Sequence, residues 1–350
     1  MSKVLVRATN WLGDAVISLP ALRAIRQVFP HAHLAVLARQ GVVGLYARES
    51  AIDQVIPYPA TKGLRGRRDV AAGLRALAFD CAILLPNAFD AALTVWLAGI
   101  PERIGYRRDG RGMLLTRAIE APEPGDIPRH ERFYYLELLR RAGLIERFPE
   151  SGAIRLDGIA EARQAGTAHL GALGVAGPAI GISPGAAYGD AKRWLPERFA
   201  ESGQQLAGAL GASVLVFGAE AERPLCETVA ELLRRAGTEA RNLACETSLP
   251  EFIDLAAACR LFLTNDSGAM HVASALGVPT VAVFGATDDT TTGPTGDLAR
   301  VIREHAECSP CLLRQCPIDH RCMTRVTAAA VTAEKVAAVA LDLWTHEAKS

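Results

Sequence analysis

One carboxylate and one lysine stand where a group-transfer reaction could use them. Asp14 closes the turn RATNWLGD after an apolar strand, at the head of a predicted helix. A carboxylate there can act as a general base, although an Asp in that position can equally cap the helix. Lys192 ends the loop GISPGAAYGDAK after another strand, where it can neutralise a diphosphate or lie at the surface as an ordinary lysine.

A phosphate site is predicted in residues 261–285, which form an apolar strand, a polar turn, a small-residue helix and a second strand. Ser267 and Gly268 leave the first backbone N–H groups of the helix uncovered, and these groups suit a phosphate. Asp266 would repel that phosphate, so we expect it to cap the helix or bind a hydroxyl. His271, among Ala, Val and Leu, fits a hydrogen-bonded core histidine better than a catalyst. The alternative is an ordinary buried turn between strand and helix.

Four cysteines and a histidine crowd the sequence CSPCLLRQCPIDHRC: Cys308, Cys311, Cys316, His320 and Cys322. Such a group can hold zinc in a tetrahedral site, but the spacing fits no standard zinc finger. Packed free thiols or a disulfide are the alternatives, and we assign no metal. The other cysteines, in apolar or helical surroundings, are expected to be core thiols of a reducing compartment: Cys81, Cys226, Cys245 and Cys259.

The composition is that of a folded protein with no overall preference for nucleic acid. The chain has 350 residues, enough for two domains, and its 38 basic residues balance its 38 acidic ones. Local charge differs, because residues 62–75 and 103–111 are rich in arginine. Each stretch forms either a solvated basic face or a site for an anionic ligand or membrane surface. Without a signal peptide or a long apolar run, we expect a soluble, cytoplasmic protein.

The first half alternates strands and helices. Apolar runs predict strands at 3–7, 33–39, 54–58 and 80–86, and an amphipathic helix at 132–142. The helix after the first turn reaches Phe29 and contains Pro20, which predicts a kink or a break. Such alternation is typical of a parallel sheet covered by helices on both faces.

The pattern starts afresh near residue 160. Strands are predicted at 179–184, 212–217, 261–264 and 280–284, with a helix at 219–236. We therefore expect two doubly wound α/β domains, 1–160 and 161–330. A final helix at 331–350 is predicted from a Thr332 cap and an apolar stripe of Val336, Val339 and Leu343.

Several common nucleotide and hydrolase motifs are missing. The sequence has no G-x-G-x-x-G dinucleotide fingerprint and no G-x-x-x-x-G-K-[ST] phosphate loop. It also has no G-x-S-x-G nucleophile elbow. NAD-dependent redox chemistry, P-loop ATP hydrolysis and serine hydrolase chemistry therefore lose their main support.

As a set, these motifs resemble a known family. The resemblance rests on the segments RATNWLGDAV, LLPNAFDAAL, IPERIGYRRDGR, ISPGAAYGDAKRWLPERFAE, NDSGAMHVASALGVPTVAVFGATD and the cysteine-rich tail. Across nearly the whole chain, they resemble the lipopolysaccharide heptosyltransferases of glycosyltransferase family 9, and most closely the type II members. The resemblance implies the GT-B fold, with two facing Rossmann-like domains, a cleft between them, and a final helix that packs back on the first domain.

The resemblance also assigns residues. It makes Asp14 the catalytic base and Lys192 the lysine that binds the donor phosphates. The donor would be bound by Asn10, Gly13, Ser183, Gly185, Lys192, Gly218, Asp266, Ser267, Gly268, Ala269, Met270 and His271. The acceptor would be bound by Arg65, Arg67, Arg68, Asn87, Tyr106 and Arg107. Residues 88–90 are less standard for the family, which weakens the acceptor side.

The implied reaction is an inverting transfer of heptose from ADP-L-glycero-D-manno-heptose to a lipid A–Kdo–heptose acceptor, the heptosylated inner core of lipopolysaccharide. It needs no cofactor and no metal. We expect a monomer that associates with the anionic inner face of the inner membrane. The alternatives are a type I or III heptosyltransferase, a nucleotide-sugar epimerase of similar architecture, and a nucleotide-binding protein without catalysis.

Overall fold

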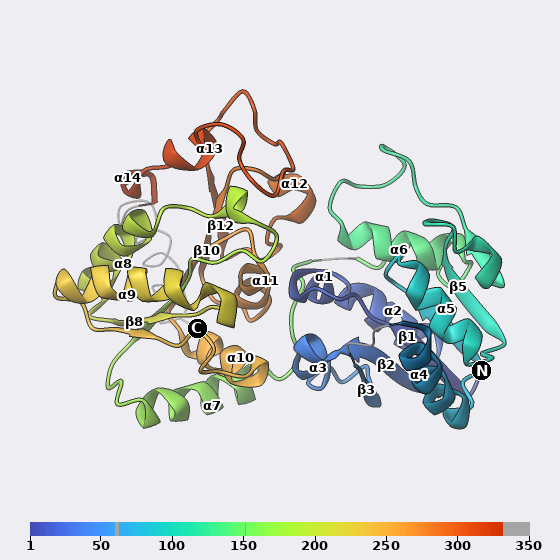
Figure 1. The fold of residues 1–350 in the computed structure, drawn as a ribbon. Helices are drawn as coiled ribbons and strands as arrows, with labels where there is room; N and C mark the ends of the chain where they lie inside the picture. The colour runs from blue at the N-terminus through green and yellow to red at the C-terminus, as the bar shows by residue number, and fades with distance from the viewer. Residues whose placement is uncertain (60–62, 151, 332–350) are drawn as a thin grey trace. The chain divides into compact units, whose positions relative to one another are not determined.

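The chain folds into two compact units, Met1–Ser151 and Gly152–Ser350, in a computed structural model that describes residues 1–59, 63–150 and 152–331 (Figure 1). The boundary falls before the predicted residue 160. Ile154 donates its N–H to Thr295 Oγ1 at 2.8 Å, and Leu156 donates to the Ala275 carbonyl at 3.0 Å. These bonds tie the connecting segment to the second unit. The predicted final helix lies outside the described residues beyond Val331.

The first unit contains one parallel sheet of six strands in the order β3-β2-β1-β4-β5-β6. The strands are β1 (Lys3–Arg7), β2 (His33–Arg39), β3 (Gln54–Tyr58), β4 (Cys81–Leu84), β5 (Glu102–Tyr106) and β6 (Arg117–Ile119). The helices are α1 (Leu12–Ile17), α2 (Leu19–Val28), α3 (Gln40–Tyr46), α4 (Gly63–Leu77), α5 (Phe89–Leu97), the 3₁₀ helix η1 (Gly112–Leu114) and α6 (Arg132–Arg141). The strand order reverses between β1 and β4, and open α/β sheets bind ligands at the carboxyl ends of the strands at such a point.

The second unit repeats this topology, with the strand order β12-β11-β10-β7-β8-β9. Its strands are β7 (Ala179–Ser183), β8 (Ser213–Val216), β9 (Ala240–Asn242), β10 (Leu261–Asn265), β11 (Thr280–Phe284) and β12 (Ala299–Arg303). Its helices are α7 (Ile159–Ala172), η2 (Asp190–Lys192), α8 (Pro196–Leu210), η3 (Glu220–Glu222), α9 (Arg223–Arg235), α10 (Leu249–Ala258), α11 (Gly268–Ala275), α12 (Asp289–Thr292), α13 (Arg321–Thr324) and α14 (Ala328–Val331). Here the order reverses between β7 and β10.

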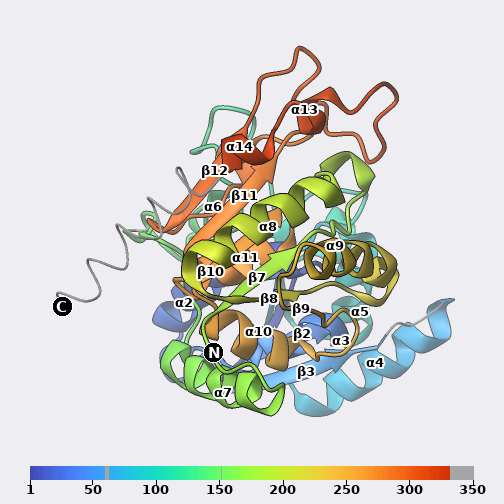
Figure 2. The ribbon, with the colours of Figure 1, turned by 90° about the vertical axis from the view of Figure 1, so that its left-hand side faces the viewer.

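Both faces of the second sheet are covered, as the alternation along β10 shows. Leu261 and Leu263 belong to a core shared with α8 and α9, and Figure 2 shows α8 running along the near side of these strands. Phe262 points to the other face, where its ring lies 6.1 Å from that of Phe252 on α10. Because both faces are buried, these strands read as unbroken apolar runs in the sequence.

The sequence predicted eight of the strands and missed β5, β6, β9 and β12. Three of these four are edge strands, and β5 lies next to an edge. Their sequences, such as RAI and ARN, are short and carry charged residues that remain partly exposed. An apolar run is therefore absent, and only pairing with a neighbour defines these strands.

The predicted interruption at Pro20 is confirmed as a break. α1 ends at Ile17 and α2 starts at Leu19, which puts Pro20 in the first turn of α2. A proline is tolerated there because the first N–H groups of a helix have no partner within it.

Within the described residues, no helix combines the length and the apolar content that crossing a bilayer requires.

The contact between α7 and α10 depends on a glycine. A β-carbon on Gly166 would lie 1.9 Å from the carbonyl oxygen of Asp254 on α10. Gly171 lies on the same helix, with no atom within 4 Å of such a β-carbon. Alanine substitutions at the two positions therefore distinguish the effect of helix packing, at Gly166, from that of helix propensity, at Gly171.

We expect Gly166→Ala to lower the free energy of unfolding by about 1–3 kcal/mol, because backbone on α10 must move. The matched variant Gly171→Ala should raise it by up to about 1 kcal/mol through helix propensity. Urea unfolding followed by circular dichroism measures both. Equal effects of the two substitutions would show that the α7–α10 contact is not as tight as described.

Candidate functional site

Lys192 lies at the carboxyl end of β10, where it pairs with Asp266. Its Nζ is 2.6 Å from Asp266 Oδ2, and the two side chains are only 13% and 5% exposed. Thr287 donates its hydroxyl to the same carboxylate oxygen at 2.6 Å. The alternative of an ordinary surface lysine is therefore wrong, because the ammonium group is fixed beside the turn that begins α11.

Asn265 fastens the loop that carries Lys192. Its amide nitrogen donates to the Pro184 carbonyl at 2.7 Å, and its amide oxygen accepts the backbone N–H of Trp194 at 3.0 Å. Trp194 is itself buried, and its indole N–H donates to the Val326 carbonyl at 2.9 Å. Both ends of the loop after β7 are thus attached to fixed elements of the second unit.

The start of α11 is capped by Ser267 and not by Asp266. Ser267 Oγ accepts the Met270 N–H at 3.4 Å and lies 3.1 Å from Thr264 Oγ1. The capping role proposed for Asp266 is therefore wrong, because its carboxylate is used by Lys192 and the Thr287 hydroxyl. Hydroxyl binding, the other expected role, stays a prediction for a ligand, while within the protein the carboxylate accepts the Thr287 hydroxyl.

The residues of α11 divide into accessible and buried ones. Ser267, Gly268 and Ala269 are half-buried, and their amides begin the helix, where N–H groups have no partner within it. Met270 is fully buried and its N–H bonds to Ser267, so its predicted contact with the donor needs correction to a core role. His271 is also buried, as expected of a core histidine.

The other predicted donor residues of the second unit line the same edge of the sheet. Ser183 ends β7 and is buried. A β-carbon on Gly185 would lie 2.1 Å from Glu222 Oε1, and one on Gly218 would lie 2.6 Å from Cys226 Sγ. Close packing against the buried Cys226 accounts for Gly218, whereas the carboxylate of Glu222 could move away from a larger residue at 185.

In the first unit, Asp14 and Gly13 lie in α1, directly after the carboxyl end of β1. Trp11 occupies the N-cap position, so the alternative of Asp14 as the helix cap is wrong. A carboxylate in the first turn is stabilised by the helix dipole. Burial, with the negative charge of Asp14 as the next cause, raises the pKa of the Tyr135 hydroxyl well above its usual value.

The turn before α1 is held by a buried arginine that the sequence did not single out. Arg7 is 1% exposed, and it donates to the Ala8 carbonyl at 2.5 Å and to Asn10 Oδ1 at 2.8 Å. Its guanidinium carbon lies 4.5 Å from the centre of the Tyr58 ring. Burial lowers the pKa of Arg7. Asn10 thus supports the turn, and its side-chain oxygen is already occupied.

Tyr106, which was expected to meet the acceptor, and Arg111 of the basic stretch are both structural. Tyr106 is fully buried and donates its hydroxyl to the Tyr134 carbonyl at 2.7 Å, so its predicted acceptor contact needs correction. Arg111, which the sequence placed in a basic stretch, is also fully buried. It donates to the carbonyls of Tyr106 and Pro86, and burial lowers its pKa to about 10.

Asn87 lies beside this buried network. It follows β4, and it is half-buried. Arg111 reaches its side-chain oxygen at 3.4 Å, and its amide nitrogen donates to the Tyr134 hydroxyl at 2.8 Å. The side chain is therefore oriented at the point where the strand order reverses.

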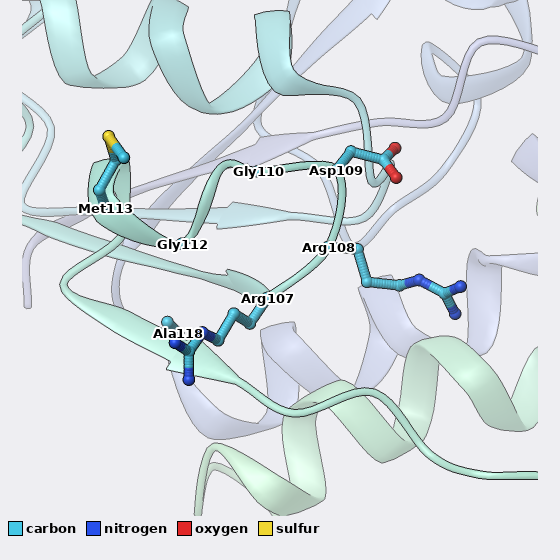
Figure 3. Close-up of a pocket in the computed structure, with 7 residues that line it drawn as sticks. All are labelled: Arg107, Arg108, Asp109, Gly110, Gly112, Met113 and Ala118. Carbon is cyan, nitrogen blue, oxygen red and sulfur yellow. The ribbon is translucent and has the colours of Figure 1, made fainter.

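The remaining predicted acceptor arginines lie nearer the surface. Arg65 and Arg68 on α4 are exposed, whereas Arg67 is half-buried. Arg107 is exposed and pairs with Glu120 at 3.1 Å. Figure 3 shows it at an open pocket of about 620 Å³ lined by Arg107, Arg108, Asp109, Gly110, Gly112, Met113 and Ala118.

The cysteines are free thiols in the structure. Within the described residues, no group of three or more His, Cys, Asp and Glu side chains is arranged to hold a metal ion, so the zinc site considered at Cys308, Cys311, Cys316 and Cys322 gains no support. The expectation of a core thiol at Cys245 is wrong, because that side chain is exposed. Cys81, Cys226 and Cys259 are buried, and burial raises the pKa of each thiol to about 12.

Comparison with known proteins identifies the family of the chain. The model of glycosyltransferase family 9 (heptosyltransferase) matches residues 67–321. The chain belongs to glycosyltransferase family 9. It is 34% identical over 311 residues to lipopolysaccharide heptosyltransferase 2 of Escherichia coli K12 and 33% identical to that of Salmonella typhimurium LT2. Each match covers 86% of this chain and 88% of the relative.

A solved structure, that of E. coli ADP-heptose lps heptosyltransferase II, confirms the GT-B fold class. The match has a TM-score of 0.81 and 29% sequence identity, and covers 97% of this chain and 99% of that one. Family 9 membership makes the protein a glycosyltransferase. The sequence singled out Lys192 and Asp266 but missed their partner Thr287, because the surrounding sequence ATDD carries no pattern that marks a site residue.

We expect Lys192→Ala to raise the Kd for ADP by roughly 10- to 100-fold, because a hydrogen bond to a charged group is lost. The loss should grow as salt falls, since charge is least screened there. Titration calorimetry measures both effects. Arg198→Ala, which removes an arginine paired on the surface of α8, is the control and should bind ADP normally.

The lysine variant also leaves Asp266 buried without its cation, which costs about 3–5 kcal/mol of stability. The double variant Lys192→Met/Asp266→Asn removes both charges and should regain much of that stability while still binding ADP weakly. Unchanged ADP affinity in the folded single variant would remove Lys192 from the donor site.

Proposed function

We propose that this family 9 enzyme is a type 2 heptosyltransferase of lipopolysaccharide core synthesis. It transfers heptose from ADP-L-glycero-D-manno-heptose to the heptosylated inner core, with inversion at the anomeric carbon, and it works as a monomer without a cofactor. The Lys192–Asp266–Thr287 arrangement at the start of α11 carries the proposal. The identity of about one third to type 2 enzymes supports the choice of type.

The donor half of the reaction uses the second unit. As the bond from the anomeric carbon to the diphosphate oxygen breaks, the electron pair leaves with ADP and negative charge grows on the diphosphate. Lys192 and the first amides of α11 stabilise that charge. Thr287 keeps Asp266 oriented, so the lysine stays in place before the donor arrives.

The acceptor half uses Asp14. Its carboxylate takes the proton of the acceptor hydroxyl while that oxygen bonds to the anomeric carbon. One displacement inverts the configuration and needs no nucleophile from the enzyme. Asp14 is half-buried, which leaves it accessible.

We expect Asp14→Asn to lower kcat by about two to four orders of magnitude, the usual worth of a general base, while ADP affinity stays unchanged. Mass spectrometry of the heptosylated product measures turnover. The control is Asp69→Asn, at an exposed position on α4. An Asp14→Asn enzyme within threefold of the wild type would contradict the assignment and revive the alternative of a non-catalytic binding protein.

The same assay separates the related activities. Acceptors with no, one or two heptoses distinguish type 1, 2 and 3 enzymes, and the proposal requires turnover only on the acceptor with one heptose. An epimerase would convert ADP-heptose without any acceptor. Family 9 membership favours transfer over epimerisation.

We further propose that the first unit docks on the anionic inner face of the cytoplasmic membrane, where the acceptor lipid is anchored. Exposed apolar side chains follow four of its strands at their carboxyl ends: Trp11 after β1, Leu64 after β3, Phe89 after β4 and Met113 after β5. Arginines accompany them at Arg65, Arg68, Arg107 and Arg108. Apolar side chains mixed with cations suit the boundary between headgroups and acyl chains.

We expect the triple change of Arg65, Arg68 and Arg108 to Ser to weaken binding to vesicles of anionic phospholipid by roughly 10- to 100-fold, since each cation contributes about 1 kcal/mol. The acceptor KM should rise and the donor KM should stay the same. Vesicle co-sedimentation at physiological salt measures binding. The matched control changes Arg198, Arg234 and Arg235 of the second unit to Ser. If both triple variants lose vesicle binding equally, the loss reflects the net charge of the protein and not a docking surface.

A further inference from the structure

The segment 308–322, called here the cysteine segment, packs on the loop that carries Lys192. Ala191, next to the lysine, donates its N–H to the Arg314 carbonyl at 3.1 Å, and its own carbonyl lies 3.0 Å from His320 Nε2. Leu312 donates its N–H to the Ala286 carbonyl, beside Thr287, at 2.8 Å. Backbone contacts therefore fix the middle of the segment to both sides of the lysine site.

The loop approaches Arg314 as closely as a backbone can. A β-carbon on Gly189 would lie 2.1 Å from the carbonyl oxygen of Arg314. This neighbour is backbone and cannot swing aside as a flexible side chain would. Any other residue at 189 would push Arg314 away from the loop.

Tyr188 brings the two cations together. Lys192 Nζ lies 4.8 Å from the centre of its ring, and the guanidinium carbon of Arg314 lies 5.1 Å from the same centre. The Tyr188 hydroxyl donates to the Leu312 carbonyl at 2.8 Å, so the ring is attached to the cysteine segment. Each cation is attracted to the ring electrons, which holds both side chains at one place.

The two cations differ in their charge balance. Lys192 is neutralised by Asp266. Arg314 is exposed, and within the part of the chain that the structure describes its guanidinium has no acidic partner. The positive charge of Arg314 is thus left uncompensated near Lys192. The fold holds these two like charges close together on the Tyr188 ring, against their mutual repulsion.

We propose that Arg314 is a second cation of the donor site and binds the diphosphate together with Lys192. This inference rests on the proposed function, since it adds a residue to the same donor site. A guanidinium can donate two parallel hydrogen bonds to one phosphate, which a lysine cannot. Lys192 and Arg314 together match a ligand that carries charge on two neighbouring phosphates, so the site prefers a nucleoside diphosphate to a monophosphate.

The test is titration calorimetry of the full chain with ADP, AMP and adenosine. We expect Arg314→Gln to raise the Kd for ADP about 10-fold or more, to change that for AMP less, and to leave that for adenosine unchanged. Arg314→Lys should recover part of the ADP affinity. The control Arg300→Gln, on β12, should bind all three ligands as the wild type does.

The Tyr188 ring offers a second variant pair. Tyr188→Phe keeps the ring and should keep most of the ADP affinity, whereas Tyr188→Leu removes the surface that both cations share and should weaken ADP binding. Equal behaviour of the two variants would overturn the role of the ring.

The outcomes for inference and proposed function are separate. If Lys192→Ala weakens ADP binding and Arg314→Gln does not, Arg314 is a solvated surface residue and the inference is wrong. If the wild-type protein fails to bind ADP at all, the proposed function itself fails.

Discussion

The ion pair between Lys192 and Asp266 is the constraint on which the proposed donor site depends. Both groups are largely buried, and taking two charges out of water costs more than their attraction returns unless further hydrogen bonds complete the arrangement. Thr287 supplies such a bond, and Asn265 fixes the loop that delivers the lysine. The surroundings of β10 are therefore built to hold a charge in place, which an ordinary turn between strand and helix does not require.

The two units use one topology for different tasks. In each, the strand order reverses beside the first strand, and the turn after that strand brings functional side chains to the carboxyl edge. The first unit holds its turn with the buried Arg7 and presents a carboxylate at Asp14. The second holds its loop with Asn265 and presents a cation at Lys192. The candidate base and the candidate donor-binding lysine thus lie at equivalent positions of one repeated scheme.

The sequence predicted what depends on local pattern and missed what depends on distant contacts. Buried strands such as β7 and β10 begin with apolar runs that revealed them, whereas the polar edge strands β9 and β12 are defined only by pairing. Asp14 and Lys192 follow recognisable strands, so their places after the carboxyl ends of those strands could be predicted, while their roles in catalysis and donor binding stay predictions.

Burial is the property that the sequence could not supply at the acceptor side. Tyr106 and Arg111 are residue types that are common in surface binding sites, yet both are fully buried. The Arg111 guanidinium donates its hydrogen bonds to backbone carbonyls. At the donor side, Thr287 and Tyr188 matter through partners from other parts of the chain. A helix cap is similarly ambiguous, since Asp266 and Ser267 are both good capping residues and only the backbone geometry selects Ser267.

The bond from the Trp194 indole to the Val326 carbonyl has a consequence for how the protein matures during synthesis. The loop that carries the lysine is fastened by residues 265, 314 and 326, all of which leave the ribosome long after the loop itself. Domains generally fold as units in the order of synthesis, so the first unit can form while the second is still incomplete. The Lys192–Asp266 geometry is therefore acquired late, and a ribosome that stalls before Val326 leaves a chain with a formed first unit and an unfinished lysine loop.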